Sequence, residues 1–334
     1  TSSSDTVIPL PDYYVQPQYA ETNDLKIYCV QNGGSSNPYT VLKIISKVTG
    51  AVVLERTFFI SNTVMVLDTP VFSVFNYPRI ILIAKDLTTS NLIYWYIPTS
   101  NFYSTSSINT GVNFSNISAM DACANSTAEV LAITIKEAGV WKLKLYYGSG
   151  VGGFPGTATS TVTLADYSAT GPDMLSICAF QTGWRVFFHG TFETSSTVKY
   201  YNVNSSGVIV GSAVTACNDF QSNQKTHITS VSDSTYTYML VSSARPSSPT
   251  QHVIKQFKLD ASDTVIQSEF AENAVVQSRP IIYNNKLFVA VARVTAGSGT
   301  LQDIATYSLM AKSLTKSTQA FLIAKELDFI YMPI

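Results

Sequence analysis

A short turn followed by an apolar β-type run recurs six times along this chain, at nearly even spacing. The runs are ETNDLKIYCV, FNYPRIILIA, ANSTAEVLAIT, FQTGWRVFF, SDSTYTYMLV and YNNKLFVAV. One marker residue in each turn gives steps of 49 to 56 residues between Asn23, Asn76, Asn125, Gln181, Asp233 and Asn284. An internal period of this length indicates a repeat architecture, in which each unit is one supersecondary element.

Each unit has the same order of predicted strands. One strand precedes the turn (VFSVF, ISAMDAC, DMLSICAF, THITSV, RPIIY), and the recurring run after the turn is the second. A polar loop leads to the third, in YTVLKII, NLIYWYI, VWKLKLYY, TVKYYNV, HVIKQFKL and DIATYSL. A fourth, weaker strand ends the unit, as in AVVLERTFF, GVIVGSAV and DTVIQSEF. β-branched and aromatic residues dominate these runs and no long window has a helical period, so the sequence predicts an all-β chain.

Four strands in a unit of about 50 residues match one blade of a β-propeller, and the chain resembles β-propellers in this repeat organisation. We predict a six-bladed β-propeller with four antiparallel strands per blade, as a single domain over residues 1–334. The ring is expected to close by pairing of TVIPLPDYYVQ near the N-terminus with FLIAKELDFIYMPI at the C-terminus. Two β-sandwich domains are the alternative, which does not explain the even period. The marks of WD repeats, kelch repeats and sialidases are missing.

The charge of the chain excludes some classes of function. Charged residues make up 13% of the sequence and the formal net charge is −1, so no basic footprint for a nucleic acid is present. Hydrophobic residues make up 46%, which is enough for a folded core. No apolar run reaches the roughly 18–20 residues of a membrane span, so we expect no transmembrane segment. The opening TSSSDTVIPLP suits a chain that has lost a signal peptide, or a trimmed one.

Four N-x-S/T patterns predict N-glycosylation, and therefore an extracellular or cell-surface protein. Asn113, Asn116 and Asn125 lie in NFSNISAMDACANST, and Asn204 lies in NSS. All four fall in predicted loops, where a glycan must sit. The strand order predicts Asn125 and Asn204 on one axial face and Asn113 and Asn116 on the opposite face. Chance is the alternative explanation, because Asn, Ser and Thr are common in this chain.

The four cysteines are Cys29, Cys123, Cys178 and Cys217, and they lack the spacing of a metal site, so no metal is expected. Cys123 and Cys178 are predicted near the ends of the first strands of two neighbouring units. A Cys123–Cys178 disulfide is geometrically feasible there. Cys29 is expected to be a small buried hydrophobe. One disulfide and no disulfide remain open alternatives.

The three histidines indicate one candidate catalytic set. His189, His227 and His252 are all predicted on the axial face opposite Asn125. For a secreted hydrolase or lyase, the candidate catalytic residues on this face are His227, His189, Asp173, Arg279 and Asp68. Such side chains can act as acid, base or ligand, but polar residues gather at the loops of any such ring. No G-x-S-x-G elbow, phosphate loop or calcium loop is present.

Aromatic residues mark the third strand of three successive units, in Tyr94, Trp95, Tyr96, Tyr146, Tyr147, Tyr200 and Tyr201. Because side chains alternate along a strand, half of them are expected in the core between blades. The alternative is an aromatic side wall that docks another subunit or stacks on sugar rings.

These features favour recognition or assembly over catalysis. The first hypothesis is a secreted or cell-surface glycoprotein that acts as a structural or interaction module, such as a subunit of an extracellular filament, coat or surface layer. Its partners would be proteins or further copies of itself, with glycans as a further class, and no cofactor is expected. A carbohydrate-binding adhesion propeller and the hydrolase or lyase described above are the alternatives.

Overall fold

The computed structural model consists almost entirely of strands. It describes residues 14–21, 25–32, 39–46, 48–58, 60–67, 79–86, 88–98, 106–125, 127–149, 154–167, 171–172, 174–190, 197–217, 227–245, 248–262, 265–270, 274–276, 280–283, 286–295, 299–308 and 317–319. Within these ranges no α-helix occurs, and one short 3-10 turn, η1, spans Phe114–Asn116. The prediction of an all-β chain is confirmed.

The described strands form six antiparallel sheets, each built from consecutive strands of the chain. Sheets 1 and 2 contain, in order from inside to outside, β1 (Tyr14–Glu21), β2 (Leu25–Asn32), β3 (Tyr39–Ser46) and β4 (Val52–Phe58), then β5 (Ile60–Leu67), β6 (Arg79–Asp86), β7 (Asn91–Pro98) and β8 (Ser106–Asn113). Sheets 3 and 4 contain β9 (Ile117–Ala124), β10 (Glu129–Glu137), β11 (Val140–Gly148) and β12 (Ser160–Thr163), then β13 (Met174–Phe180), β14 (Gly183–His189), β15 (Val198–Val203) and β16 (Ile209–Cys217).

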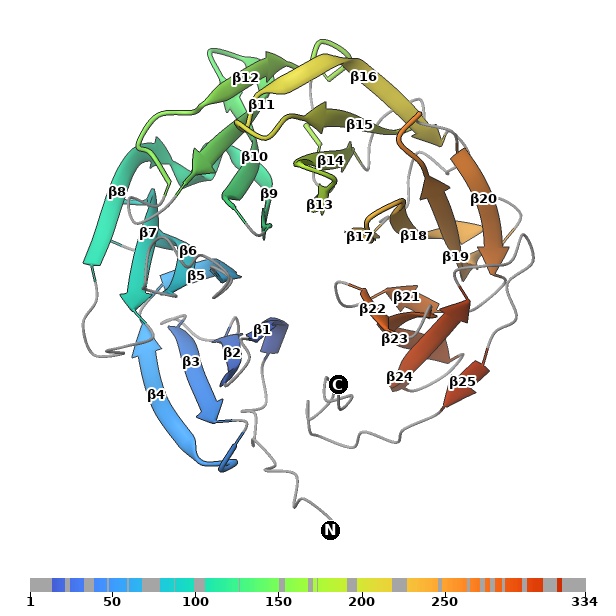
Figure 1. The fold of residues 1–334 in the computed structure, drawn as a ribbon, viewed down its shortest axis with the longest axis horizontal. Coiled ribbons are helices and arrows are strands. Elements are labelled where there is room, and N and C mark those ends of the chain that lie inside the picture. The colour runs from blue at the N-terminus through green and yellow to red at the C-terminus, as the bar shows by residue number, and fades with distance from the viewer. Residues whose placement is uncertain are drawn as a thin grey trace.

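Sheet 5 contains β17 (His227–Ser232), β18 (Thr237–Arg245), β19 (Ser248–Leu259) and β20 (Val265–Phe270). Sheet 6 contains β21 (Ala274–Val276), β22 (Ile281–Tyr283), β23 (Lys286–Thr295), β24 (Gly299–Ser308) and β25 (Ser317–Gln319). Its inner position is shared, because β21 and β22 both pair with β23. The six sheets stand around a common axis, with the first strand of each sheet nearest to that axis (Figure 1).

The turn residues that marked the repeat lie where expected in the three sheets that show them. Asn125, Gln181 and Asp233 each follow the innermost strand, of sheets 3, 4 and 5 respectively. The side-chain oxygen Oδ1 of Asn125 accepts hydrogen bonds from the backbone N–H groups of Thr127 and Ala128, which shapes the turn before β10. In the same way, Oδ1 of Asp233 accepts hydrogen bonds from the backbone N–H groups of Thr235 and Tyr236.

Two details of the predicted repeat differ from the structure. The inner strand of sheet 2 is β5 (Ile60–Leu67), a segment to which the sequence pattern assigned no strand, whereas VFSVF at 71–75 and Asn76 lie outside the described residues. The predicted pairing of the terminal segments is not confirmed. β1 pairs with β2 of its own sheet, and residues 321–334 lie outside the described part.

The core lies between adjacent sheets. Sheets 2 and 3 enclose a cluster that includes Tyr94, Ile133 and Tyr146. Sheets 3 and 4 enclose a second cluster around Trp141, Trp184 and Phe188, and sheets 4 and 5 a third, whose members include Phe187 and Tyr200. Since alternate residues of a strand point to opposite faces, each middle sheet is apolar on both faces. Because neighbouring sheets cover both faces of a middle sheet, polar side chains reach solvent mainly at the strand ends and on the outermost strands.

Candidate functional site

The structure describes only part of the predicted catalytic set. Asp68, Asp173 and Arg279 lie outside the described residues. His227 is the first residue of β17, and His189, the last residue of β14, pairs in register with Met174 at the start of β13. Since β13 and β17 are neighbouring inner strands, the backbones of His189 and His227 lie at the same axial end of sheets 4 and 5.

The imidazole of His189 is buried, with 1% of its surface exposed. Its Nδ1 atom lies 3.3 Å from the backbone carbonyl oxygen of Thr197, which can only accept a hydrogen bond. Strand alternation places His189 on the same face of β14 as Phe187, in the interface between sheets 4 and 5. The ring is therefore not accessible to a substrate in this structure.

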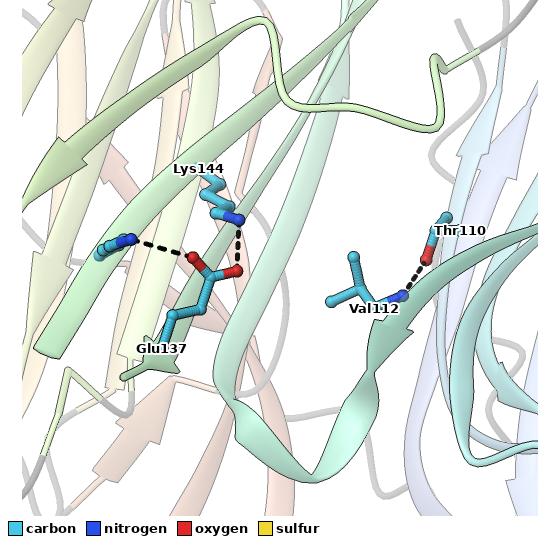
Figure 2. Close-up of polar contacts among 5 residues, drawn as sticks. Thr110, Val112, Glu137 and Lys144 are labelled. Carbon is cyan, nitrogen blue, oxygen red and sulfur yellow. Dashed lines mark hydrogen bonds and ion pairs between the residues drawn. The ribbon is translucent and has the colours of Figure 1, made fainter. Parts of the chain in front are cut away.

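A second cluster of charges lies on the hairpin between β10 and β11. The carboxylate of Glu137 accepts a hydrogen bond from Lys142 Nζ at 3.1 Å and another from Lys144 Nζ. Figure 2 shows these contacts together with the hydrogen bond from Val112 N to Thr110 Oγ1 in β8. Lys144 is the main cause that lowers the pKa of Glu137. A carboxylate held ionised between two ammonium groups is a poor proton donor, so this cluster suits structure better than acid catalysis.

The described residues contain no group of His, Cys, Asp and Glu side chains that could hold a metal ion. They also include no helix that is long and apolar enough to cross a membrane.

The two inner-strand cysteines are thiols, so the predicted Cys123–Cys178 disulfide is not formed. The physical reason is the alternation of side chains along β13. Cys123 packs against the cluster between sheets 3 and 4, whereas Cys178 belongs to the cluster between sheets 4 and 5. Cys29 lies in β2, and Cys217 is the last residue of β16.

The four acceptor asparagines lie at the ends of strands or in turns. Asn113, Asn116 and Asn204 are exposed, and Asn125 is half-buried. Asn113 is the last residue of β8 and thus not wholly in a loop. In Asn113, Asn125 and Asn204 the atom that accepts the turn's backbone hydrogen bonds is Oδ1. A glycan is attached through the other atom, Nδ2, and so is compatible with these turns.

The aromatic residues of the third strands mostly fill the core. Tyr94, Tyr96, Tyr146, Tyr200 and Tyr201 are buried, and Trp95 and Tyr147 are half-buried. Burial raises the pKa of Tyr146 to about 12, and the charge of Glu137 adds to this effect. The Gly-rich stretch between β11 and β12 joins the same core, because Phe154 packs against Tyr94 and its backbone N–H donates to Tyr96 Oη at 3.0 Å. The core interpretation of these rings is therefore confirmed for the five buried tyrosines.

The outermost strands form a nearly uncharged rim. The rim is defined here as β4, β8, β12, β16, β20 and β25, and its charged residues are Glu55, Arg56 and Glu269. Three rim strands are interrupted by irregular pairing, near Val53 in β4, Gly111 in β8 and Gly211 in β16. Gly111 and Gly211 have φ values of 71° and 73°, which glycine adopts without strain. Such bulges disrupt direct pairing of an edge strand with a foreign strand.

Comparison with known proteins establishes the fold. No family model and no curated protein matches the chain. Solved structures do match: the β-propeller domain of the Trilobed protease from Pyrococcus furiosus has a TM-score of 0.51 at 10% identity, over 92% of this chain and 83% of that domain. A prolyl endopeptidase has a TM-score of 0.55 at 9% identity over 93% of this chain. The protein has the β-propeller fold.

A further solved structure that matches is not described as a peptidase. The subtype N10 neuraminidase-like protein of A/little yellow-shouldered bat/Guatemala/060/2010 has a TM-score of 0.50 at 9% identity, over 94% of this chain and 97% of that one. The propeller spans 42% of the prolyl endopeptidase chain that it matches. At such low identity the likeness concerns the fold alone, so function has to be argued from the surface of this propeller.

Two hairpins on the rim of the propeller expose valine side chains. The hairpin between β3 and β4 exposes Val48, Val52 and Val53, with Val48 83% exposed. The hairpin between β15 and β16 exposes Val208 and Val210, with Val210 51% exposed. We call these the sheet 1 hairpin (residues 48–53) and the sheet 4 hairpin (residues 204–210). Sequence reasoning missed both, although the uncharged stretches VTGAVVL and VNSSGVIVGSAVTAC could have indicated them.

Proposed function

We propose that this propeller is a secreted or cell-surface glycoprotein that acts as a structural or interaction module, as a subunit of an extracellular filament, coat or surface layer. The observation that carries the proposal is the nearly uncharged rim, in which β8, β12, β16 and β25 have no charged residue. The sheet 1 and sheet 4 hairpins expose valine side chains on this rim.

The rim is unusual because outer strands are where solitary β-proteins place charges. Edge strands of natural sheets are commonly protected from association by lysine, by other charges or by bulges. The rim strands of this chain contain bulges but few charged residues. A surface built in this way resists random strand pairing but can still pack against another surface through uncharged side chains. Such packing suits a subunit of an assembly.

Glycosylation supports the extracellular location within the proposal. Asn113, Asn116 and Asn204 are exposed to solvent. In the turns at Asn113 and Asn204 the backbone hydrogen bonds are accepted by Oδ1, which leaves Nδ2 for substitution by a sugar. Asn113 and Asn116 lie on one axial face and Asn125 and Asn204 on the other. Because Asn113 ends the rim strand β8 and Asn204 begins the sheet 4 hairpin, sugars at these ends would leave the middle of the rim strands for protein contacts.

The proposal includes a ring of six blades. Six separate sheets in the described residues support this count. The propeller of the Trilobed protease, which this chain resembles, is described as having an open velcro topology. Closure of the ring by the two terminal segments and the single domain over residues 1–334 remain predictions.

The alternatives from other classes have less support. Several proteins of similar fold are peptidases, so a hydrolase is the second candidate function. Yet His189 is buried between two sheets, and Glu137 is held by two lysines. Sugar binding by an exposed aromatic surface has little support, because five of the seven aromatic residues of the third strands are buried in the core.

The test is a pair of measurements on protein from its native source. Sedimentation analysis should show species larger than a monomer, and non-reduced peptide mapping should show glycans on at least one of the four acceptor asparagines. A particle that stays monomeric at high concentration would rule out the assembly. Four unmodified asparagines would rule out the glycoprotein and remove the main support for an extracellular location.

A further inference from the structure

We propose that the hairpin of β10 and β11 binds a small oxyanion, held by the ammonium groups of Lys142 and Lys144. The site is independent of the proposed assembly. The observation that carries it is the ion-pair cluster around Glu137, where one carboxylate serves two ammonium groups. One positive charge of this cluster is therefore left over among the described residues.

The other ion pairs between described residues have one ammonium group for each carboxylate. Lys43 pairs with Glu55 in sheet 1, and Lys199 of sheet 4 pairs with Asp166. At Glu137, each carboxylate oxygen instead accepts a hydrogen bond from a different lysine (Figure 2). Charge is thus balanced in the first two pairs and unbalanced at Glu137.

Both ammonium groups keep donors for a ligand. An ammonium group has three N–H donors and no acceptor. Within the described residues, Lys142 and Lys144 each make one hydrogen bond, in both cases to Glu137. Strand alternation puts both lysines on the same face of β11 as Tyr146, toward sheet 2. Two donors on each lysine are thus available on one face of the hairpin.

Partial burial strengthens the attraction of this hairpin for an anion. The side chain of Lys144 is 17% exposed and that of Lys142 is 30% exposed. Opposite charges attract more strongly there than in bulk water, and salt screens them less. Lys136, over the ring of Trp141 at 5.5 Å, adds a further positive charge to the same hairpin. A small ion can still reach the two lysines from solvent.

The other described carboxylates of sheets 2 and 3 do not balance this charge. Asp121 pairs in register with Ala132, five residues from Glu137 along β10, and Glu129 begins β10. At about 3.3 Å per residue these positions lie about 16 Å or more from Glu137, beyond the Debye length of about 10 Å. Asp86 of sheet 2 is bound by the threonines of its own turn.

A bound anion would complete a neutral group of two ammonium ions and two anions. Glu137 shows that the spacing of the two ammonium groups suits an oxyanion, because its two oxygens contact one lysine each. A neutral ligand gains less from these charges, and a cation is repelled, so the charge selects the class of ligand. A free inorganic oxyanion and the carboxylate of an acidic sugar share this chemistry.

The experiment is an NMR titration of the full, isotope-labelled chain with sodium sulfate or sodium glucuronate, at an ionic strength held constant with sodium chloride. We expect saturable shifts of the backbone amide resonances of Lys142 and Lys144, and none with glucose. Lys142→Gln and Lys144→Gln should each weaken binding about tenfold or more, because each removes a charged donor. Saturation by glucuronate would extend the site to acidic sugars, and saturation by sulfate alone would assign it to inorganic oxyanions.

Two further variants keep the test decisive. Glu137→Gln retains both lysines and removes the competing carboxylate, so it should bind the anion more tightly than the natural chain, and it replaces a lysine variant that fails to fold. Lys43→Gln, from a one-to-one pair, is the matched control and should bind like the natural chain. Unchanged affinity in Lys144→Gln, or no saturable shift in either the natural chain or Glu137→Gln, would overturn the site and leave the proposed function standing.

Discussion

Asp121 on β9 accepts a hydrogen bond of 2.8 Å from the backbone N–H of Ile177 on β13, and so joins the inner strands of sheets 3 and 4. Comparable contacts recur between neighbouring sheets. The hydroxyls of Ser176 and Ser230 lie 2.8 Å apart between sheets 4 and 5, and the Thr134 hydroxyl donates to the carbonyl oxygen of Pro172 at 3.0 Å. Polar side chains near the axis therefore hold sheets together that share no strand pairing.

Removing the Asp121 carboxylate should destabilise the protein. In Asp121→Ala the N–H of Ile177 loses its acceptor in a partly buried site, which should lower the free energy of unfolding by about 1–3 kcal/mol. Asp121→Asn retains a side-chain oxygen and should lose less. Urea denaturation followed by circular dichroism measures the difference. Equal midpoints for Asp121→Ala and the natural chain would show that this contact contributes nothing.

Arg185 should be essential for the interface between sheets 4 and 5. Its guanidinium is buried, donates to Thr237 Oγ1 at 3.1 Å and to the carbonyl oxygens of Leu259 and Asp260, and lies 4.1 Å from the ring centroid of Phe180. Arg185→Met should lower the free energy of unfolding by at least about 2 kcal/mol, because buried carbonyl groups lose charged donors.

Arg185→Lys separates charge from geometry. Lysine keeps the positive charge but lacks the planar fork that reaches several acceptors at once, so it should recover only part of the loss. As a control, Lys136→Met removes a cation from above Trp141, at 5.5 Å, and should cost about 1 kcal/mol or less. Full recovery of stability in Arg185→Lys would contradict the role of the fork.

Two glycines of the sheet 4 rim should respond differently to alanine. Both Gly207 and Gly211 have positive φ values, of 75° and 73°, so either substitution strains the backbone by about 1–2 kcal/mol. At Gly207 the new methyl group would also lie 2.4 Å from Cβ of Tyr147 in sheet 3, whereas at Gly211 nothing lies within 4 Å.

Gly207→Ala should therefore lower the free energy of unfolding by about 1–3 kcal/mol more than Gly211→Ala. Thermal or urea unfolding of the two variants measures this difference directly. Because the backbone strain is matched, any excess at Gly207 reports the packing of the sheet 4 hairpin on sheet 3. An equal loss of stability in both variants would mean that the sheet 4 hairpin and Tyr147 move apart to accept the added methyl group at little cost in free energy.

The Glu137 cluster should make stability depend on acid pH. Its folded-state pKa lies below the ordinary value because of Lys144 and Lys142, so its stabilising effect is present above the ordinary glutamate pKa of about 4.3. The effect is lost as the pH falls through the lowered folded-state value. Glu137→Gln should therefore show a shallower loss of stability than the natural chain below about pH 5. Unfolding midpoints between neutral and acid pH measure it, and parallel curves for the two proteins would exclude this linkage.

The strand content could be predicted because each strand carries its own local signal. Runs such as VWKLKLYY and DMLSICAF combine branched and aromatic residues with bounding turn residues, and the structure places β11 and β13 on them. The turn residues Asn125, Gln181 and Asp233 were found for the same reason, since turn chemistry is local. The prediction missed β5 because it took VFSVF, which directly precedes the turn at Asn76, as the first strand of the second unit, whereas β5 spans ISNTVMVL.

For the candidate site, the sequence alone could predict the residue composition of the surface but not which strands form that surface. The shortage of charge was visible in the sequence, but which strands form the rim follows from the order of strands in each sheet. The exposure of Val208 and Val210 depends on where β16 ends up relative to β12 and Tyr147, which no local pattern contains.

The amino-acid sequence by itself determined the repeat, the strand type of each segment and the low charge of the surface, because these depend on residue type and on neighbours along the chain. Only the tertiary structure decided what each strand face meets. It sent Cys123 and Cys178 into different interfaces, buried His189 and left the valines of two hairpins exposed. The physical reason is that alternation assigns a residue to one of two faces, whereas burial depends on the neighbouring sheet that covers that face.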